Sequence, residues 1–250
     1  MTSPARALAI LDLFGEDHPV WHPDDINEML GYTRATGYRY VRDLVESGFL
    51  AKVGAGLYAL GPRIIELDHV LRHTDPMLAA AIPAMARLTA EYDAPAVLTS
   101  VYGSRLIDIH RTATERLPDL SYGRGRLRPF AVGAAPKVVL SWVPPKELKR
   151  LYSENAEAMR AAGLGTTLDE VSAALRAIRA RDHYVSVGEL EAEISAVAVA
   201  VRGPDGTRSH ALALVGASEE FPITDIDAAV VALHQCRAEI EAALSPDEAE

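Results

Sequence analysis

The residues best equipped to bind a ligand lie close together near the start of the chain. They are guanidinium, hydroxyl and phenol groups at short spacings, namely Thr33, Arg34, Thr36, Tyr38, Arg39 and Arg42. Arginine carries a permanent charge and a planar fork of N–H donors, whereas hydroxyl groups both donate and accept single hydrogen bonds. Such groups contact phosphate oxygens and the edges of nucleic-acid bases. A solvated polar helix face has the same composition, so the flanking segments must distinguish the two interpretations.

The flanking segments have the spacing of two helices joined by a tight turn. Capping residues at 22–25 and apolar residues at 26, 29 and 30 predict a helix that ends at Gly31. Thr33 can cap a second helix, which has apolar residues at 40, 41, 44 and 45 and ends at Gly48. A shorter helix is expected before them at 7–14. This pattern is typical of a helix-turn-helix, in which the second helix enters the major groove of DNA.

Two short strands are expected after the second helix, at 49–53 and 57–60, around a glycine turn at 54–56. Three helices followed by a hairpin predict a winged helix, and we place this domain at residues 1–62. Lys52 can reach a neighbouring groove or phosphate, although a tight hairpin turn explains the glycines equally well. Gly37, inside the second helix, costs about 1 kcal/mol relative to alanine. It either permits a close approach to the backbone or simply weakens the helix.

The distribution of charge agrees with this interpretation better than the total does. The net charge of −10 argues against a nucleic-acid partner, because lysine and arginine supply most of that binding energy. Residues 1–30, however, hold one arginine against six acids, whereas residues 31–63 hold four arginines and one lysine against two acids. A basic segment of net +3 therefore follows an acidic segment of net −5.

Composition excludes several other classes of protein. A length of 250 residues with 49% apolar and 24% charged residues indicates folded domains rather than disorder. No apolar run approaches the roughly 18 residues of a membrane-spanning helix, and the first residues lack the apolar stretch of a secretory signal. We therefore expect a cytoplasmic protein with no membrane partner. A single cysteine, Cys236, excludes an intramolecular disulfide and is expected to be a small buried apolar residue.

The rest of the chain predicts a linker helix at 63–75 and a second domain at 76–250. Pro76 and Pro83 are expected to break the helical pattern that runs to about residue 92. Strands are expected at 96–102, 106–111, 185–187, 194–202 and 210–215, with helices at 135–142, 146–152, 167–181 and 225–244. Helices packed on one antiparallel sheet make the predicted fold class α+β.

These residues together resemble the IclR type of bacterial transcription regulator. The resemblance rests on GYTRATGYR at 31–39, on LYALGPR at 57–63 and on FAVGAAPK at 130–137. It implies a GAF-like effector domain after the winged helix, and a near-palindromic operator in double-stranded DNA. It further implies a homodimer, or a dimer of dimers, paired through the linker helix. The implied ligand is a small organic acid, and no cofactor or enzymatic activity is expected. The sequence is compatible with either a repressor or an activator.

The resemblance also suggests where the acid would bind. In the family, the loop before the Lys137 helix presents backbone amides to a small carboxylate, and here Ala134 and Ala135 hold those positions, while Pro136 removes one amide. Positions that are often polar in the family are matched here by Ser186, Ala196, Ala213 and Val215. With Phe130 beside them, they predict a site for an apolar or aromatic acid, unless the domain binds no ligand.

Three arginines alternate in the basic segment that precedes this loop. If the segment is extended, Arg124, Arg126 and Arg128 lie on the same side of a strand. We assign Arg126 to the effector site because one or more of these side chains can pair with an anion. A solvent-facing or dimer-facing row of arginines fits the pattern equally well.

Other chemistry has weaker support. His69 and His73 stand four residues apart on the linker helix, but no HExxH pattern or third ligand accompanies them, so no metal site is expected. No Gly-x-Ser-x-Gly nucleophile motif occurs. Two alternatives stay open: an enzyme that acts on an anionic substrate, and a regulator whose second domain serves only for assembly.

Overall fold

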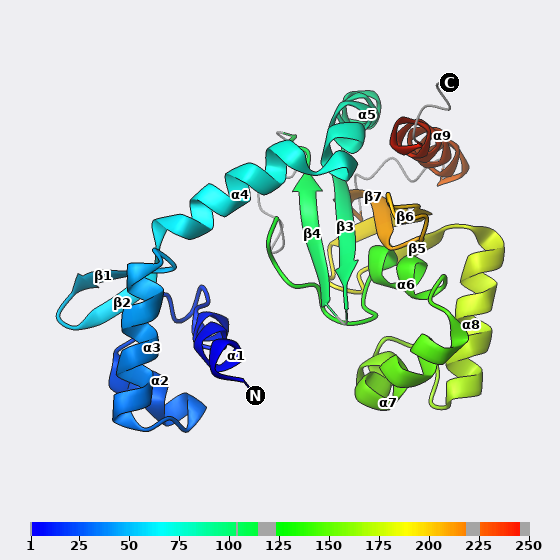
Figure 1. Ribbon diagram of the computed structural model, residues 1–250. Helices are drawn as coiled ribbons and strands as arrows, with labels where there is room; N and C mark the ends of the chain where they lie inside the picture. Colours follow the sequence, from blue (N-terminus) through cyan, green and yellow to red (C-terminus); the bar gives the residue numbers. More distant parts are fainter. Residues whose placement is uncertain (1, 104, 115–123, 219–225, 246–250) are drawn as a thin grey trace, which may run out of the picture. The chain divides into compact units, whose positions relative to one another are not determined.

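A computed structural model of the chain describes residues 2–103, 105–114, 124–218 and 226–245 (Figure 1). The chain divides into two compact units, residues 1–74 and residues 75–250. The α+β class predicted from the sequence is confirmed, since helices accompany two antiparallel sheets. None of the described helices is long and apolar enough to cross a membrane.

The first unit contains the elements expected of a winged helix, followed by one further helix. In chain order they are α1 (Ser3–Leu8), the 3-10 helix η1 (Leu11–Leu13), α2 (Pro23–Leu30), α3 (Arg34–Glu46), β1 (Leu50–Gly54), β2 (Leu57–Leu60) and α4 (Pro62–Thr74). The apolar core of this unit is formed by Ile10, Ile26, Tyr40, Val41, Leu44 and Leu50.

The single helix predicted over 7–14 is wrong. The α-helix ends at Leu8, and a short 3-10 segment follows in which Leu13 donates to the carbonyl of Ile10. The indole Nε1 of Trp21 donates to the carbonyl of Leu13 at 3.0 Å. This long-range bond satisfies a carbonyl at the segment's end, where the tighter turn leaves it unpaired.

Local residues determine where α2 and α3 begin and end. Gly31 has φ +64°, the left-handed conformation that ends α2 without a Cβ penalty. Two residues later, the side chain of Thr33 accepts a hydrogen bond from the Thr36 amide at 3.4 Å and caps α3. The turn between the helices is therefore fixed by a glycine and a threonine.

Gly37 occupies the place where α3 lies against α2. A Cβ atom at this position would lie 1.5 Å from Oδ1 of Asn27, far inside any real contact. Asn27 is buried, and among the described residues neither its Oδ1 nor its Nδ2 has a hydrogen-bond partner. The close approach therefore involves a buried side chain of α2, and it requires a residue without a side chain at position 37.

The second unit is built on a five-stranded antiparallel sheet of order β4-β3-β7-β6-β5. Its strands are β3 (Ala96–Tyr102), β4 (Arg105–Arg111), β5 (Tyr184–Val187), β6 (Ile194–Val201) and β7 (His210–Ala217). Its helices are α5 (Pro76–Tyr92), α6 (Ala134–Leu140), α7 (Pro145–Ala161), α8 (Leu168–Arg181) and α9 (Ile226–Leu244).

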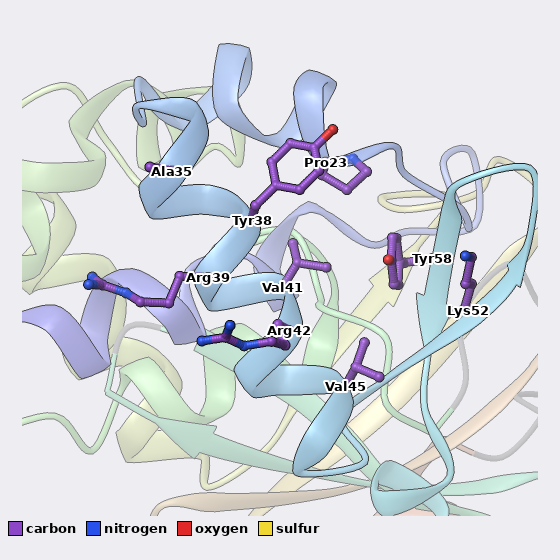
Figure 2. Close-up of a pocket in the computed structure, with 9 residues that line it drawn as sticks. All are labelled: Pro23, Ala35, Tyr38, Arg39, Val41, Arg42, Val45, Lys52 and Tyr58. Atoms are coloured by element: carbon purple, nitrogen blue, oxygen red, sulfur yellow. The ribbon is translucent and has the colours of Figure 1, made fainter.

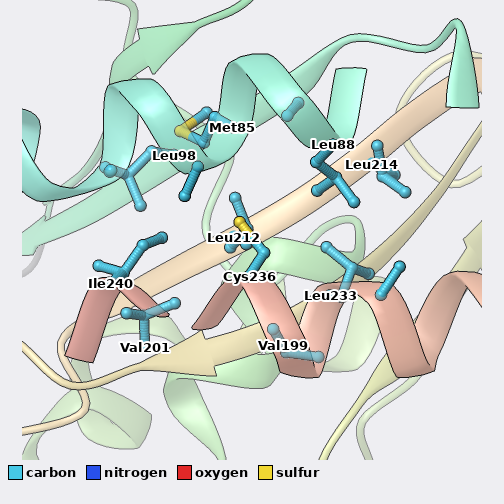
Figure 3. Close-up of a cluster of buried hydrophobic side chains, with 14 of the residues drawn as sticks. Met85, Leu88, Leu98, Val199, Val201, Leu212, Leu214, Leu233, Cys236 and Ile240 are labelled. Carbon is cyan, nitrogen blue, oxygen red and sulfur yellow. The ribbon is translucent and has the colours of Figure 1, made fainter. Parts of the chain in front are cut away.

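The two faces of this sheet carry side chains of different size. Large residues such as Leu98, Leu212 and Leu214 face α5 and α9, where they pack with Met85 and Leu233 (Figure 3). The opposite face of β6 and β7 is mostly alanine, and it packs against α6, through Ala198, Ala200, Ala211 and Ala213. Alternate strand residues point to opposite faces, so the strand sequences themselves create this asymmetry.

Two further expectations for this unit are wrong. Pro83 does not break the helical pattern, because α5 continues from Pro76 to Tyr92 with Ala81, Ala84 and Met85 buried around the proline. Burial of this face offsets the lost backbone hydrogen bond. The segment 124–130 is not a regular strand: residues 124–125 form a turn, and Leu127 makes only an isolated bridge to Ile107.

Replacing Gly37 by alanine should lower the free energy of unfolding of the first unit by about 1–3 kcal/mol, the usual cost of overpacking. We expect this loss although alanine favours a helix over glycine by about 1 kcal/mol. The matched control is the double variant Gly37→Ala/Asn27→Ala, in which the clash is removed and stability should return. Urea unfolding followed by circular dichroism measures both, and an unchanged Gly37→Ala protein would contradict the packing argument.

Candidate nucleic-acid interface and ligand cavities

A groove of about 470 Å³ lies between α3 and the β1–β2 wing (Figure 2). It brings together four of the predicted binding residues, Tyr38, Arg39, Arg42 and Lys52. Figure 2 shows Arg39 and Arg42 extending from successive turns of α3 on the same side. The remaining lining residues are Pro23, Ala35, Val41, Val45 and Tyr58. The groove therefore joins a cationic helix surface to the base of the wing.

The arginines of α3 are exposed and only loosely held. The Arg34 side chain is 77% exposed, and its Nε lies 3.4 Å from a carboxylate oxygen of Asp24. The pKa of Arg34 is raised above its usual value, chiefly by its hydrogen bond with Tyr38 and then by the charge of Asp24. Arg42 lies 3.7 Å from Glu46 and is also mostly exposed. Surface ion pairs of this kind contribute only about 0–1 kcal/mol, so a phosphate can replace the carboxylates.

The two predicted threonines lie at the start of α3, outside the groove. Thr33 Oγ1 donates to Thr36 Oγ1 at 2.9 Å while it accepts from the Thr36 amide. The hydroxyl of Thr33 is thus occupied in capping the helix. Thr33 is exposed and Thr36 is half-buried at the helix start, where both hydroxyl groups can also face a ligand.

Two aromatic residues that hold the wing were missed from the sequence. Trp21 and Tyr58 exchange backbone hydrogen bonds of 2.9 Å in both directions, which adds a third short pairing to the hairpin. Tyr58 also stands directly opposite Lys52 in the β1–β2 register. The alternation of side chains between the two faces of the wing strand would have indicated that Tyr58 faces α3. No local sequence pattern, however, reveals its pairing with Trp21.

Six of the predicted effector residues line one small cavity between α6 and the sheet. They are Ala134, Ala135, Ser186, Ala196, Ala213 and Val215. The cavity measures about 20 Å³, roughly the space of one water molecule. A small-molecule site is usually about 300–1,000 Å³. An organic acid can therefore enter only if the cavity opens.

The other two predicted effector residues lie elsewhere. Phe130 lines a separate apolar cleft at the other end of α6. Arg126 is exposed, and Arg128 lines the small cavity in its place. The expected alternation of three arginines on one side is wrong, because the turn at 124–125 interrupts the strand; Arg124 donates to the carbonyl of Ile109.

Arg128 is held by a buried carboxylate that sequence reasoning missed. Its Nε lies 2.8 Å from Oδ1 of Asp108, whose side chain is fully buried. The same oxygen accepts a 2.7 Å hydrogen bond from Thr99, the cross-strand neighbour of Asp108 on β3. The sequence did contain a signal for this site, because Asp108 is an acidic residue between two isoleucines of β4.

A second internal ion pair is formed by Lys137, in the middle of α6, and Glu189. Lys137 is buried, and its Nζ donates to Glu189 Oε2 at 2.7 Å and to the Tyr184 hydroxyl at 3.0 Å. Glu189 also accepts hydrogen bonds from the Gly133 amide at 3.0 Å and from the Tyr184 hydroxyl at 2.8 Å. The chain's own carboxylate thus occupies donors beside the small cavity.

Cysteine and histidine take no part in these sites. Cys236 is buried, and burial raises the pKa of its thiol to about 12, so the thiol stays protonated near neutral pH. The rings of His69 and His73 are 4.2 Å apart on α4, and His73 Nδ1 lies 2.8 Å from the His69 carbonyl oxygen. Among the described residues, no three acidic, histidine or cysteine side chains are placed to hold a metal ion.

A winged helix-turn-helix with a cationic groove, joined to a separate α+β unit, defines the class of DNA-binding transcription regulators. Residues 69–242 match the family model for the C-terminal domain of the bacterial transcriptional regulator IclR, and residues 3–54 match the IclR helix-turn-helix domain. The first match alone covers more than half of the chain. The chain therefore belongs to the IclR family and is a regulator rather than an enzyme.

Individual relatives agree with this assignment. The chain is 22% identical over 216 residues to the HTH-type transcriptional regulator KipR of Bacillus subtilis, covering 86% of each protein. A crystal structure of an IclR transcriptional regulator from Alicyclobacillus acidocaldarius has a TM-score of 0.80 at 24% identity and covers 97% of this chain and 98% of its own. An IclR homologue from Microbacterium hydrocarbonoxydans, solved with 4-hydroxybenzoate, has a TM-score of 0.78 at 20% identity, covering 97% and 99%.

Replacing Arg34 or Arg39 by alanine should weaken specific operator binding by about 1–3 kcal/mol each, since we expect each side chain to make a base or phosphate contact. Circular dichroism should stay unchanged because both side chains are exposed. Arg72→Ala is the matched control: this arginine is also exposed and paired with one carboxylate, but it lies on α4. Binding is measured at several salt concentrations on duplexes selected from a random library. Full affinity in both α3 variants would exclude α3 as the reading helix.

Proposed function

We propose that two copies of this chain bind a near-palindromic operator through α3 and the wing, and that a small apolar or aromatic acid modulates this binding. The observation that carries the proposal is the groove that joins Arg39 and Arg42 to Lys52. In this arrangement α3 enters the major groove, and Lys52 contacts a neighbouring phosphate or groove. Gel-shift measurements with and without an acid test both parts.

Pairing of two copies is proposed through α4. No residue of this helix is buried. Ile64, Leu67 and Leu71 follow at i, i+3 and i+7, the spacing of a coiled-coil seam on one face. Leu67 is 40% exposed and Leu71 is 49% exposed. A second copy of α4 would cover these apolar side chains and place two α3 helices on one operator.

The acid is proposed to bind beside Lys137. Most residues that line the small cavity are apolar, with Arg128 and Ser186 as the polar exceptions, which suits an aromatic or aliphatic acid. A carboxylate already lies beside the cavity, because Glu189 accepts from Lys137 and from the amide of the lining residue Gly133. An entering carboxylate would take the place of Glu189 on these donors, and the displaced loop would enlarge the cavity. A relative solved with 4-hydroxybenzoate supports this ligand class.

Substitution of the α4 stripe should separate the two copies. The variant Leu67→Glu/Leu71→Glu places two charges on the proposed seam and should yield monomers that bind the operator at least about tenfold more weakly, since one half-site contact is lost. The control His69→Glu adds a charge on the opposite face of the same helix. Sedimentation velocity measures the oligomeric state. If the double variant remains dimeric, the dimer interface does not lie on α4.

Removing the competing charge of Glu189 should strengthen acid binding. In Glu189→Gln the Lys137 ammonium loses its carboxylate, so benzoate should raise the melting temperature of this variant more than that of the original chain. Glu193→Gln, an exposed position on the same loop, is the matched control. Benzamide, which has the same ring without the charge, should not reproduce the effect. Equal benzoate shifts in all three proteins would contradict the site.

A further inference from the structure

A second cavity lies at the opposite end of α6 from Ala134 and Ala135. It is bounded by the β3–β4 hairpin, the last turn of α6 and the start of α7, and its volume is about 180 Å³. The residues that form its walls include Val101, Leu106, Phe130, Val139, Val143 and Leu151. Every one of these side chains is aliphatic or aromatic, so the cavity offers dispersion contacts rather than hydrogen bonds. We call it the α6–α7 cleft.

The only charged residue among the described ones that line this cleft is Glu147. Arg150 donates to both carboxylate oxygens of Glu147, at 3.2 Å and 3.1 Å from Nε, and also to Glu154 at 2.7 Å. These hydrogen bonds lower the pKa of Glu147, so the group is ionised near neutral pH. Neither Arg150 nor Glu154 lines the cleft, so the ionised Glu147 places a negative charge on its wall. An anionic ligand is therefore disfavoured there.

The volume limits the ligand further. An apolar cavity of about 150 Å³ in another protein stays dry and takes up benzene, whereas sites for larger organic molecules begin near 300 Å³. The α6–α7 cleft, at about 180 Å³, therefore has room for one six-membered ring with a small substituent. It is too small for two fused rings.

We propose that the α6–α7 cleft binds one uncharged, single-ring aromatic molecule. This site is distinct from the acid site proposed above, since the acid site uses Ala134 and Ala135 at the start of α6 and the cleft uses Val139 and Leu140 at its end. Both ligands would contact the same seven-residue helix, α6. Occupancy of the cleft can thus affect the position of Lys137 without any contact with it.

The proposal is tested on the full-length protein without DNA, so its result does not depend on operator binding. Fluorobenzene is the probe, and its fluorine NMR signal reports the bound fraction directly. We expect saturable binding of fluorobenzene and no displacement of it by para-fluorobenzoate or fluoronaphthalene. Val143→Phe, at a half-buried wall position, should lower fluorobenzene affinity about tenfold or more by filling the space. Val231→Phe on α9, outside the cleft, should leave it unchanged.

A separate pair of variants tests whether Glu147 excludes anions from the α6–α7 cleft. Glu147→Gln should allow para-fluorobenzoate to compete with fluorobenzene, whereas Glu154→Gln should not, although both remove one carboxylate from the same arginine. Melting curves show that each variant is folded. Unsaturable fluorobenzene binding, unchanged affinity in Val143→Phe, or displacement by para-fluorobenzoate from the original chain would each overturn the proposal.

Discussion

The alanine face of strands β6 and β7 determines how the second unit is arranged around α6. Ala198 pairs with Ala213, and Ala200 pairs with Ala211, across the two central strands. These short side chains let α6 pack closely on the sheet, which leaves a cavity of only about 20 Å³ at its start. At the end of α6 the larger residues Val139 and Leu140 line the apolar cleft. The size of strand side chains thus decides where the domain is closed and where it can accept a molecule.

The charged side chains of the two units differ in how strongly their ion pairs hold them. The free energies of these pairs indicate which charges are structural and which can bind a ligand. In the second unit, Arg128 and Lys137 are buried against Asp108 and Glu189. Removing one partner from such a pair typically costs about 3–5 kcal/mol, so these charges are structural unless a ligand replaces the partner. Arg34 and Arg42 of α3 form exposed pairs that contribute about 0–1 kcal/mol. They can exchange a carboxylate for a phosphate at little cost, which suits reversible DNA binding.

The sequence predicted local features well and long-range partners poorly. The helix boundaries at Gly31 and Thr33, the wing, and the positions of the strands along the chain all follow from caps, turns and periodicity. These signals act within a few residues. The partners of Arg128 and Lys137 stand 20 and 52 residues away, and only the folded sheet brings them together. Pro83 was misjudged for the same reason, since the packing of α5 outweighs a local preference. Six of the eight predicted effector residues do converge, because the family resemblance carried information that periodicity lacks.

The geometry of the proposed DNA-binding surface depends on residues outside the set predicted to contact DNA. Gly37 permits the close approach of Asn27, and this contact helps fix how α3 lies on α2. Trp21 pairs with Tyr58 and thereby fixes the wing, so that Lys52 stands at a defined position beside the groove. The arginines of α3 project from the frame formed by α2, α3 and the wing, and their exposed side chains do not contribute to its packing. The exposed side chains of α3 can therefore change without altering this frame, which depends on Gly37 and Trp21.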